Sequence, residues 1–155
     1  MWVQKIIEEI QRQAQSGGGR AVNVATGGAT VDVGVRQADA LAAALDSLVV
    51  ALPAVPGALD EAGRALAGRV TYLLEPLAVL EIGVDRVLLR SAPPRRRDGS
   101  SDYYEFWLRA EGESTVAELC RYRAHLRQPG RERLPMTFTW EQMEHLLDDL
   151  DRTLQ

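Results

Sequence analysis

Cysteine and histidine are scarce in this sequence, and their scarcity limits the chemistry available to it. There is one cysteine, Cys120, and there are two histidines in 155 residues. A lone cysteine cannot form an intrachain disulfide, which fits a reducing compartment. The sequence also lacks the nucleotide-binding motifs G-x-x-x-x-G-K-[ST] and G-x-G-x-x-G, the hydrolase motif G-x-S-x-G and the zinc motif H-E-x-x-H. We therefore expect no enzyme activity, no metal and no other cofactor.

Lysine and long apolar runs are also nearly absent. Apolar runs are short: Leu48–Leu52, for example, ends at Pro53 and is far too short to span a bilayer. The N-terminus has the charged residues Lys5, Glu8 and Glu9 within its apolar pattern, unlike a signal peptide. Lys5 is the only lysine among 18 lysine and arginine residues, a bias typical of GC-rich bacterial genomes. We expect a cytoplasmic bacterial protein that does not bind membranes.

The composition that remains is ordinary for a globular domain. Hydrophobic residues make up 46% of the chain and charged residues 26%, both close to the average. A chain of this size buries roughly 70% of the surface that its unfolded form exposes, so one core suffices. We predict a single α+β domain over residues 20–155, preceded by a helical arm over residues 1–16. The net charge of −4 argues against general binding of nucleic acid but leaves room for a local basic patch.

The predicted arm is strongly amphipathic. Its apolar side includes Trp2, Ile6, Ile7 and Ile10, and a glycine-rich joint follows at residues 16–19. Such a helix packs either on the core of its own chain or on a second copy or another protein. These four residues are therefore candidates for partner binding.

The segments before residue 70 predict a hairpin and two helices. Alternating valines on both sides of two glycines predict a hairpin over residues 22–35. Leucines at three- and four-residue spacing predict a helix over residues 39–52, and a second helix is expected over residues 58–67. Residues 58–75 fit either one longer helix or a helix followed by a strand.

Residues 69–124 alternate apolar and polar side chains and are interrupted by turn residues, as antiparallel strands are. The predicted fold is therefore α+β: a four-stranded antiparallel meander packed by a C-terminal amphipathic helix, with N-terminal helices and a small hairpin. The four expected strands are residues 69–82, 87–89, 103–110 and 115–124. Alternation places Phe106 and Leu108 on one face, with Leu119 and Ala117 opposite them on the next strand. This face is the expected core.

The opposite face of the same strands mixes aromatic and charged residues. It includes Tyr103, Trp107 and Tyr122, together with Glu105, Arg109, Glu118 and Cys120. A face of this kind is either half-covered by another segment or open to a partner. The three aromatic residues are therefore further candidates for partner binding.

The C-terminal helix has a well-marked start. Thr139 and Gln142 have the spacing of a capping box, and Phe138 and Met143 that of a hydrophobic staple. The helix has a continuous apolar stripe that begins at Trp140. We expect this stripe to cover the core face of the meander.

Three groups of residues are candidates for catalysis or metal binding: His145 with Glu141 and Asp149, Cys120 with His125, and Glu105 with Glu118. The first has no recognised metal-ligand spacing and lies on the polar side of the last helix. In the second, opposite parity on a strand points the two side chains to opposite faces. The third resembles the carboxylate pair of glycosidases, but nothing indicates a sugar cleft. We interpret all three groups as structural or solvated.

The placement of the arginines is the sharpest signal in the sequence. In an antiparallel meander, the connection after the second strand and the segment after the fourth emerge at the same end of the sheet. Eight arginines would gather there: Arg95, Arg96, Arg97, Arg121, Arg123, Arg127, Arg131 and Arg133. The opposite end has Asp85, Glu111 and Glu113. These arginines are either solvated loop residues or an anion-binding site, since guanidinium groups match phosphate and carboxylate geometry.

The functional expectation follows from the amphipathic arm, the aromatic face and the missing motifs. We expect a non-catalytic protein-interaction or adaptor module that self-associates. The alternative is an anion-binding protein, with nucleic acid, a phosphate compound or an acidic partner bound at the arginine-rich end.

Overall fold

The computed structural model describes residues 2–15 and 19–155. Within them the chain forms three helices and a ten-stranded antiparallel sheet. The predicted α+β class is confirmed, but the sheet is larger than a four-stranded meander. No helix in the described ranges is both long and apolar enough to cross a membrane.

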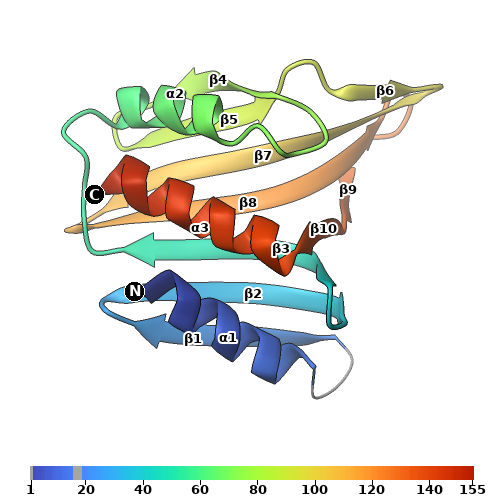
Figure 1. Ribbon diagram of the computed structural model, residues 1–155. Coiled ribbons are helices and arrows are strands. Elements are labelled where there is room, and N and C mark those ends of the chain that lie inside the picture. Colours follow the sequence, from blue (N-terminus) through green and yellow to red (C-terminus); the bar gives the residue numbers. More distant parts are fainter. Residues whose placement is uncertain (1, 16–18) are drawn as a thin grey trace.

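Seven strands form the body of the sheet in the order β1-β2-β3-β8-β7-β5-β4 (Figure 1). They are β1 (Arg20–Thr26), β2 (Ala29–Ala38), β3 (Ala42–Leu52), β4 (Leu77–Ile82), β5 (Arg86–Ser91), β7 (Ser100–Glu111) and β8 (Ser114–His125). Three short strands pair at the sides of longer ones: β6 (Arg95–Arg97) with β7, β9 (Arg131–Leu134) with β8, and β10 (Met136–Thr139) with β3.

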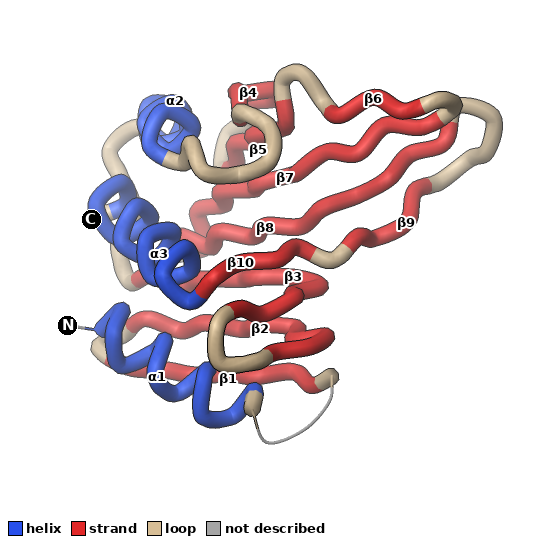
Figure 2. The backbone as a smooth tube through the Cα atoms, turned by 45° about the vertical axis from the view of Figure 1, so that its right-hand side comes forward, coloured by secondary structure: helices blue, strands red, loops and turns tan. Residues whose placement is uncertain are grey.

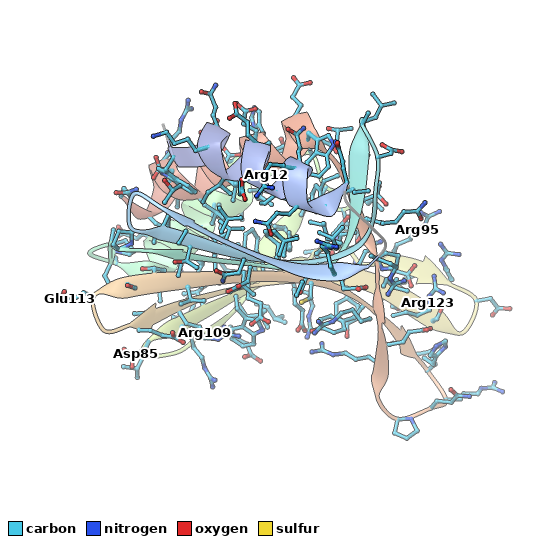
Figure 3. The ribbon with its side chains drawn as sticks, turned by 90° about the horizontal axis from the view of Figure 1, so that it is seen from below. Arg12, Asp85, Arg95, Arg109, Glu113 and Arg123 are labelled. Atoms are coloured by element: carbon cyan, nitrogen blue, oxygen red, sulfur yellow. The ribbon has the colours of Figure 1, made fainter. Side chains whose placement is uncertain are left out.

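The helices lie on one side of this sheet. They are α1 (Trp2–Ala14), α2 (Leu59–Arg69) and α3 (Trp140–Leu154). Figures 1 and 2 show all three over the same face, with α1 over β1 and β2, α3 near the middle and α2 over β4 and β5. Figure 3 shows the sheet edge-on, with the helices above it and side chains projecting below. We call the two sides the helix side and the open face.

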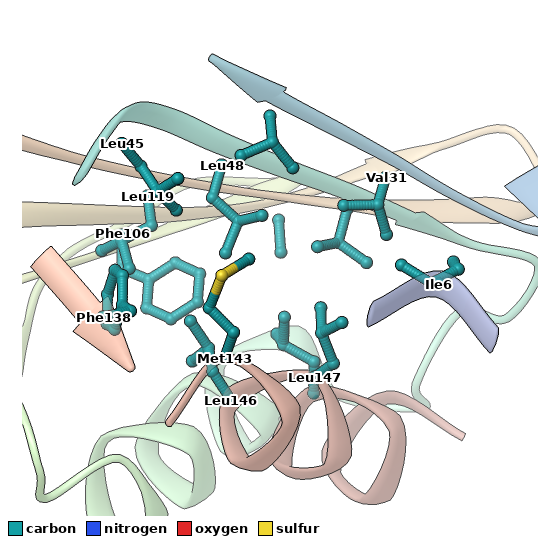
Figure 4. Close-up of a cluster of buried hydrophobic side chains, with 14 of the residues drawn as sticks. Ile6, Val31, Leu45, Leu48, Phe106, Leu119, Phe138, Met143, Leu146 and Leu147 are labelled. Atoms are coloured by element: carbon teal, nitrogen blue, oxygen red, sulfur yellow. The ribbon is translucent and has the colours of Figure 1, made fainter. Parts of the chain in front are cut away.

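One row of apolar side chains crosses the whole helix side. The strand register runs from Val79 through Leu89, Phe106, Leu119, Leu48 and Val33 to Val22. All of these are buried except the half-buried Val79 on the edge strand. Met143, Leu146 and Leu147 of α3 pack into this cluster from the helix side (Figure 4). The core is therefore a single layer between one sheet face and three helices.

Several predictions are confirmed in detail. Phe106 lies opposite Leu119 and Leu108 opposite Ala117, as expected. The hairpin at residues 22–35 forms, with both turn glycines at positive φ, where glycine has little steric cost. Thr139 caps α3 in a complete capping box, and the stripe from Trp140 onward is buried.

The helix predicted over residues 39–52 is wrong, because this segment is the strand β3. Leucines at helical spacing suggested a helix, but Leu41 is 78% exposed and contributes nothing to the core. From Ala43 onward every second residue is buried except at a bulge, and β3 lies between β2 and β8. Pairing with other strands on both of its edges therefore outweighs the helical spacing of the leucines, and the segment forms a strand.

The strand predicted over residues 69–82 is wrong in its first half. Helix α2 continues to Arg69, and β4 begins only at Leu77, directly after Pro76. The open question about residues 58–75 is answered by a helix followed by an irregular segment. Proline cannot donate to a sheet ladder, which fits a strand that begins just after it.

The predicted arm packs on the core of its own chain. Ile6, Ile7 and Ile10 are buried against the sheet, and the Trp2 indole nitrogen donates to Asp151 of α3 over 3.0 Å. These side chains fill the core over β1 and β2 and do not form a free surface. Residues 16–18 of the predicted glycine joint lie outside the described residues.

We expect Leu147→Ala to lower the free energy of unfolding by about 2–5 kcal/mol, because it opens a cavity under α3. Urea unfolding followed by circular dichroism measures the loss. The control Leu126→Ala changes an exposed side chain and should cost less than about 0.5 kcal/mol. Equally small losses in both variants would contradict the packing of α3 on the sheet.

Candidate functional site

Alternation along β7 and β8 places a mixed set of side chains on the open face. Because Phe106 and Leu108 point to the helix side, Tyr103, Glu105 and Trp107 point away from it. Neighbouring strands add further residues to this side. Together they form what we call the arginine–aromatic face: Arg86, Arg90, Arg109, Arg131, Arg133, Tyr103, Trp107 and Tyr122.

Each aromatic ring of this face has at least one guanidinium group over it. The Arg131 guanidinium carbon lies 3.6 Å from the centre of the Tyr122 ring, and that of Arg133 lies 5.6 Å from the same ring. Arg90 lies 4.8 Å from the Tyr103 ring. Trp107 contacts Arg86 and Arg109 at 5.7 and 5.6 Å. These cation–π contacts hold long, flexible side chains in defined positions on the sheet.

Glu105 is the buried anchor among these arginines. Its carboxylate pairs with Arg90 and lies 2.8 Å from Arg131. Burial raises the pKa of Glu105, but hydrogen bonds from Arg131 and Arg90 outweigh it and hold the pKa below its usual value. Glu105 therefore stays charged at neutral pH and fixes two of the five guanidinium groups.

The face has more positive than negative charge. Glu118 pairs with Arg109 over 2.7 Å, so Glu105 and Glu118 together engage three arginines. Arg86 and Arg133 form no ion pair with any described residue and instead lie over aromatic rings. These two guanidinium groups remain available to an external carboxylate or phosphate.

The arginines predicted to gather at one end of the sheet lie there, except that Arg121 is buried on the helix side. β6, with Arg95–Arg97, pairs with β7, and β9, with Arg131–Leu134, pairs with β8. Figure 3 shows Arg95 and Arg123 at one end of the sheet and Asp85 and Glu113 at the other. Both segments were expected to be loops, and both form short strands instead.

Two of these end arginines share a buried carboxylate. Arg123 and Arg97 contact Asp102 at 2.7 and 3.2 Å. The hydrogen bond from Arg123 lowers the pKa of Asp102, so this carboxylate is charged at neutral pH. Arg95, Arg96 and Arg127 are exposed and pair with no acidic side chain in the described part of the chain.

Arg121 does not belong to the exposed basic end. It points to the helix side, is buried, and forms two hydrogen bonds with the Glu75 carboxylate at 2.7 and 2.9 Å. Its guanidinium lies 4.3 Å from the Tyr104 ring, and Ser91 donates to the same carboxylate. An external anion cannot reach this group, so Arg121 is a structural residue.

The histidine and cysteine groups named as candidates for catalysis have partners within the chain. Asp149 accepts a hydrogen bond from Tyr72 over 2.8 Å and lies 3.5 Å from His145. Burial raises the pKa of the Cys120 thiol, which disfavours a nucleophilic thiolate, and His125 pairs instead with Glu132. Among residues 2–15 and 19–155, no three His, Cys, Asp or Glu side chains come together as a metal site.

The partner-binding residues predicted from sequence fall into two groups. Tyr103, Trp107 and Tyr122 lie on the open face, whereas Trp2 and the three isoleucines pack with α1 on the helix side. Sequence analysis missed Arg86 and Arg90 as members of the face. The sequence does contain a signal for them. Both lie on the strand that pairs with β7, where alternation puts Arg86 opposite Arg109 and Arg90 opposite Glu105.

Comparison with known proteins gives no independent guide to the role of this face. No family model, no curated protein and no solved structure matches the chain.

We expect Arg121→Met to lower the free energy of unfolding by about 3–5 kcal/mol, because it leaves the Glu75 carboxylate buried and unpaired. The double variant Glu75→Leu/Arg121→Met removes both charges and should recover much of this loss. Urea unfolding compares them with the exposed-site control Arg96→Ala. A loss in Arg121→Met no larger than that of the control would contradict the buried ion pair.

Proposed function

We propose that this protein is a non-catalytic protein-interaction module that binds an acidic partner protein through its arginine–aromatic face. The observation that supports the proposal is a sheet face with no described helix over it, on which five arginines lie against three aromatic rings. The arginine–aromatic face would bind the partner, and the helix side would stabilise the fold.

The composition of the face is that of a binding surface. Tyrosine, tryptophan and arginine are the residues most enriched among energetic hot spots of protein interfaces. Guanidinium groups bind carboxylates through paired, geometrically matched hydrogen bonds. Because the rings and Glu105 already hold the arginines in place, less side-chain entropy is lost on binding.

The same contacts favour a protein over single-stranded nucleic acid as the ligand. Proteins that bind single strands stack bases on exposed ring faces. Here guanidinium groups lie over the rings, and Tyr103 is only 9% exposed. The groups that the face presents are therefore arginine donors, which suit the carboxylates of an acidic surface.

Anion binding at the arginine-rich end remains the second candidate function. The exposed, unpaired positions of Arg95, Arg96 and Arg127 favour it. Phosphates of nucleic acid or polyphosphate would be the ligands, and binding would weaken steeply with added salt.

The test compares binding of fluorescent poly-glutamate by the parent protein and by Arg86→Ala/Arg133→Ala, using anisotropy at low salt. These two arginines form no ion pair with described residues, so their loss leaves no buried carboxylate orphaned. We expect the double variant to weaken binding by about tenfold or more, since each interface hot spot contributes at least 1 kcal/mol. The matched control Arg64→Ala/Arg152→Ala removes the same charge from the helices and should bind like the parent.

Three outcomes would contradict the proposal. Equal losses in the variant and the control would show that only net charge matters. Tighter binding of oligothymidylate or polyphosphate than of poly-glutamate, abolished by Arg95→Ala/Arg96→Ala/Arg97→Ala, would instead support the second candidate. A parent protein that binds none of these ligands would exclude both.

A further inference from the structure

Strand β4 is an edge of the sheet with an unusually apolar surface. It pairs with β5 on one side and has no neighbour among the described strands on the other. Leu80 and Ile82 are 51% and 54% exposed, and Val84 in the following turn is 98% exposed. At the other edge, β1 exposes Arg20, Ala21 and Asn23. Natural edge strands are usually blunted by lysine, proline or inward charges, and β4 has only Glu81 for this purpose.

A bulge makes the directions of the side chains along β4 symmetric about the middle of the strand. Val79 lies opposite Leu89 and Glu81 opposite Leu88, which leaves Leu80 as an extra residue. Leu77, Val79 and Ile82 share the helix side, because their partners on β5 do. Ala78 and Glu81 share the open face. Outside the central Val79 and Leu80, the order of sides is therefore the same from either end of the strand.

We propose that β4 pairs with β4 of a second copy of this chain, antiparallel and in one register. In that register Ala78 lies opposite the partner subunit's Glu81, and Leu77 lies opposite the partner subunit's Ile82. Open-face side chains then meet open-face side chains, and helix-side ones meet helix-side ones. Without the bulge, this register would pair opposite faces, which an antiparallel ladder does not allow.

Charge complementarity supports a second copy as the occupant. Arg90 lies opposite Ala78 on β5, so the row would continue from Arg90 across Ala78 to the partner subunit's Glu81. Arg90 stays paired with Glu105, but Glu105 also pairs with Arg131, so this cluster keeps one excess positive charge about 10 Å, or two strand spacings, from the partner subunit's Glu81. The twofold axis repeats this arrangement. On the helix side, the exposed Ile82 would face the partner subunit's Leu77, and at the centre of the pairing Leu80 would lie opposite the partner subunit's Val79.

The pairing would join two sheets into one and place both arginine–aromatic faces on the same side. This inference rests on β4 and its neighbour β5 and holds whether or not the proposed function is correct.

Sedimentation velocity of the full chain tests the assembly. We expect the parent to sediment as a dimer of the 17.1-kDa chain, and Leu80→Lys and Ile82→Lys as folded monomers. The control Leu41→Lys alters a leucine that is even more exposed but belongs to β3's end of the chain and not to β4, and it should remain dimeric. A parent that is monomeric up to about 100 μM, where contacts of micromolar affinity would associate, overturns the proposal. Dissociation of the control as well would also overturn it.

Cysteine cross-linking tests the register. Ala78→Cys and Glu81→Cys chains, mixed and mildly oxidised, should form disulfide-linked heterodimers, because opposed strand residues lie within disulfide range. Each variant alone should remain uncross-linked, since in this register neither position faces itself. The native Cys120 is buried and serves as an internal control. Cross-linking of Ala78→Cys to itself, or none in the mixture, would overturn the proposed pairing.

Discussion

Period-two alternation along β7 and β8 is the constraint on which the rest of this structure depends. Each strand is 12 residues long, and every second side chain of its central part must enter the core under α2 and α3. The remaining side chains must therefore point to the open face. Phe106 and Leu108 cannot be buried without Glu105, Trp107 and Arg109 appearing on the other side. The chemistry of the open face is thus fixed by the same register that builds the core.

That face would be unfavourable if its charged groups were simply buried beside aromatic rings. Glu105 is nearly inaccessible to solvent, and an isolated buried carboxylate is costly. Arg90 and Arg131 offset this cost, and both reach Glu105 from strands on either side of β7 and β8. On the helix side, Arg121 and Glu75 solve the same problem and tie the segment before β4 to β8. Glu105 thus ties β5 and β9 to β7, and Glu75 ties the segment before β4 to β8.

The sequence predicts local features well and long-range pairing poorly. The register of β7 and β8 follows from a short turn, in which Gly112 has positive φ, and from alternating side chains on both strands. The start of α3 follows from its capping box. β3 was missed because its leucines fit two periods, and its partners are distant in sequence. Arg121 shares the parity of Leu119, so its inward direction could be predicted, whereas its partner Glu75, 46 residues away, could not.

Two sets of residues that sequence analysis treated separately meet on one surface. The aromatic residues were candidates for a protein partner, and the arginines were candidates for an anion. Tyr122 and Arg131 come from neighbouring strands and lie in direct contact, so neither can bind a ligand independently of the other. The acidic partner proposed above would contact both. If two copies join at β4, their faces lie side by side, and a partner with two acidic segments gains affinity from the raised effective concentration of the second site. Pairing at β4 would then set the number of binding sites in the assembly, and the arginine–aromatic face would set their specificity.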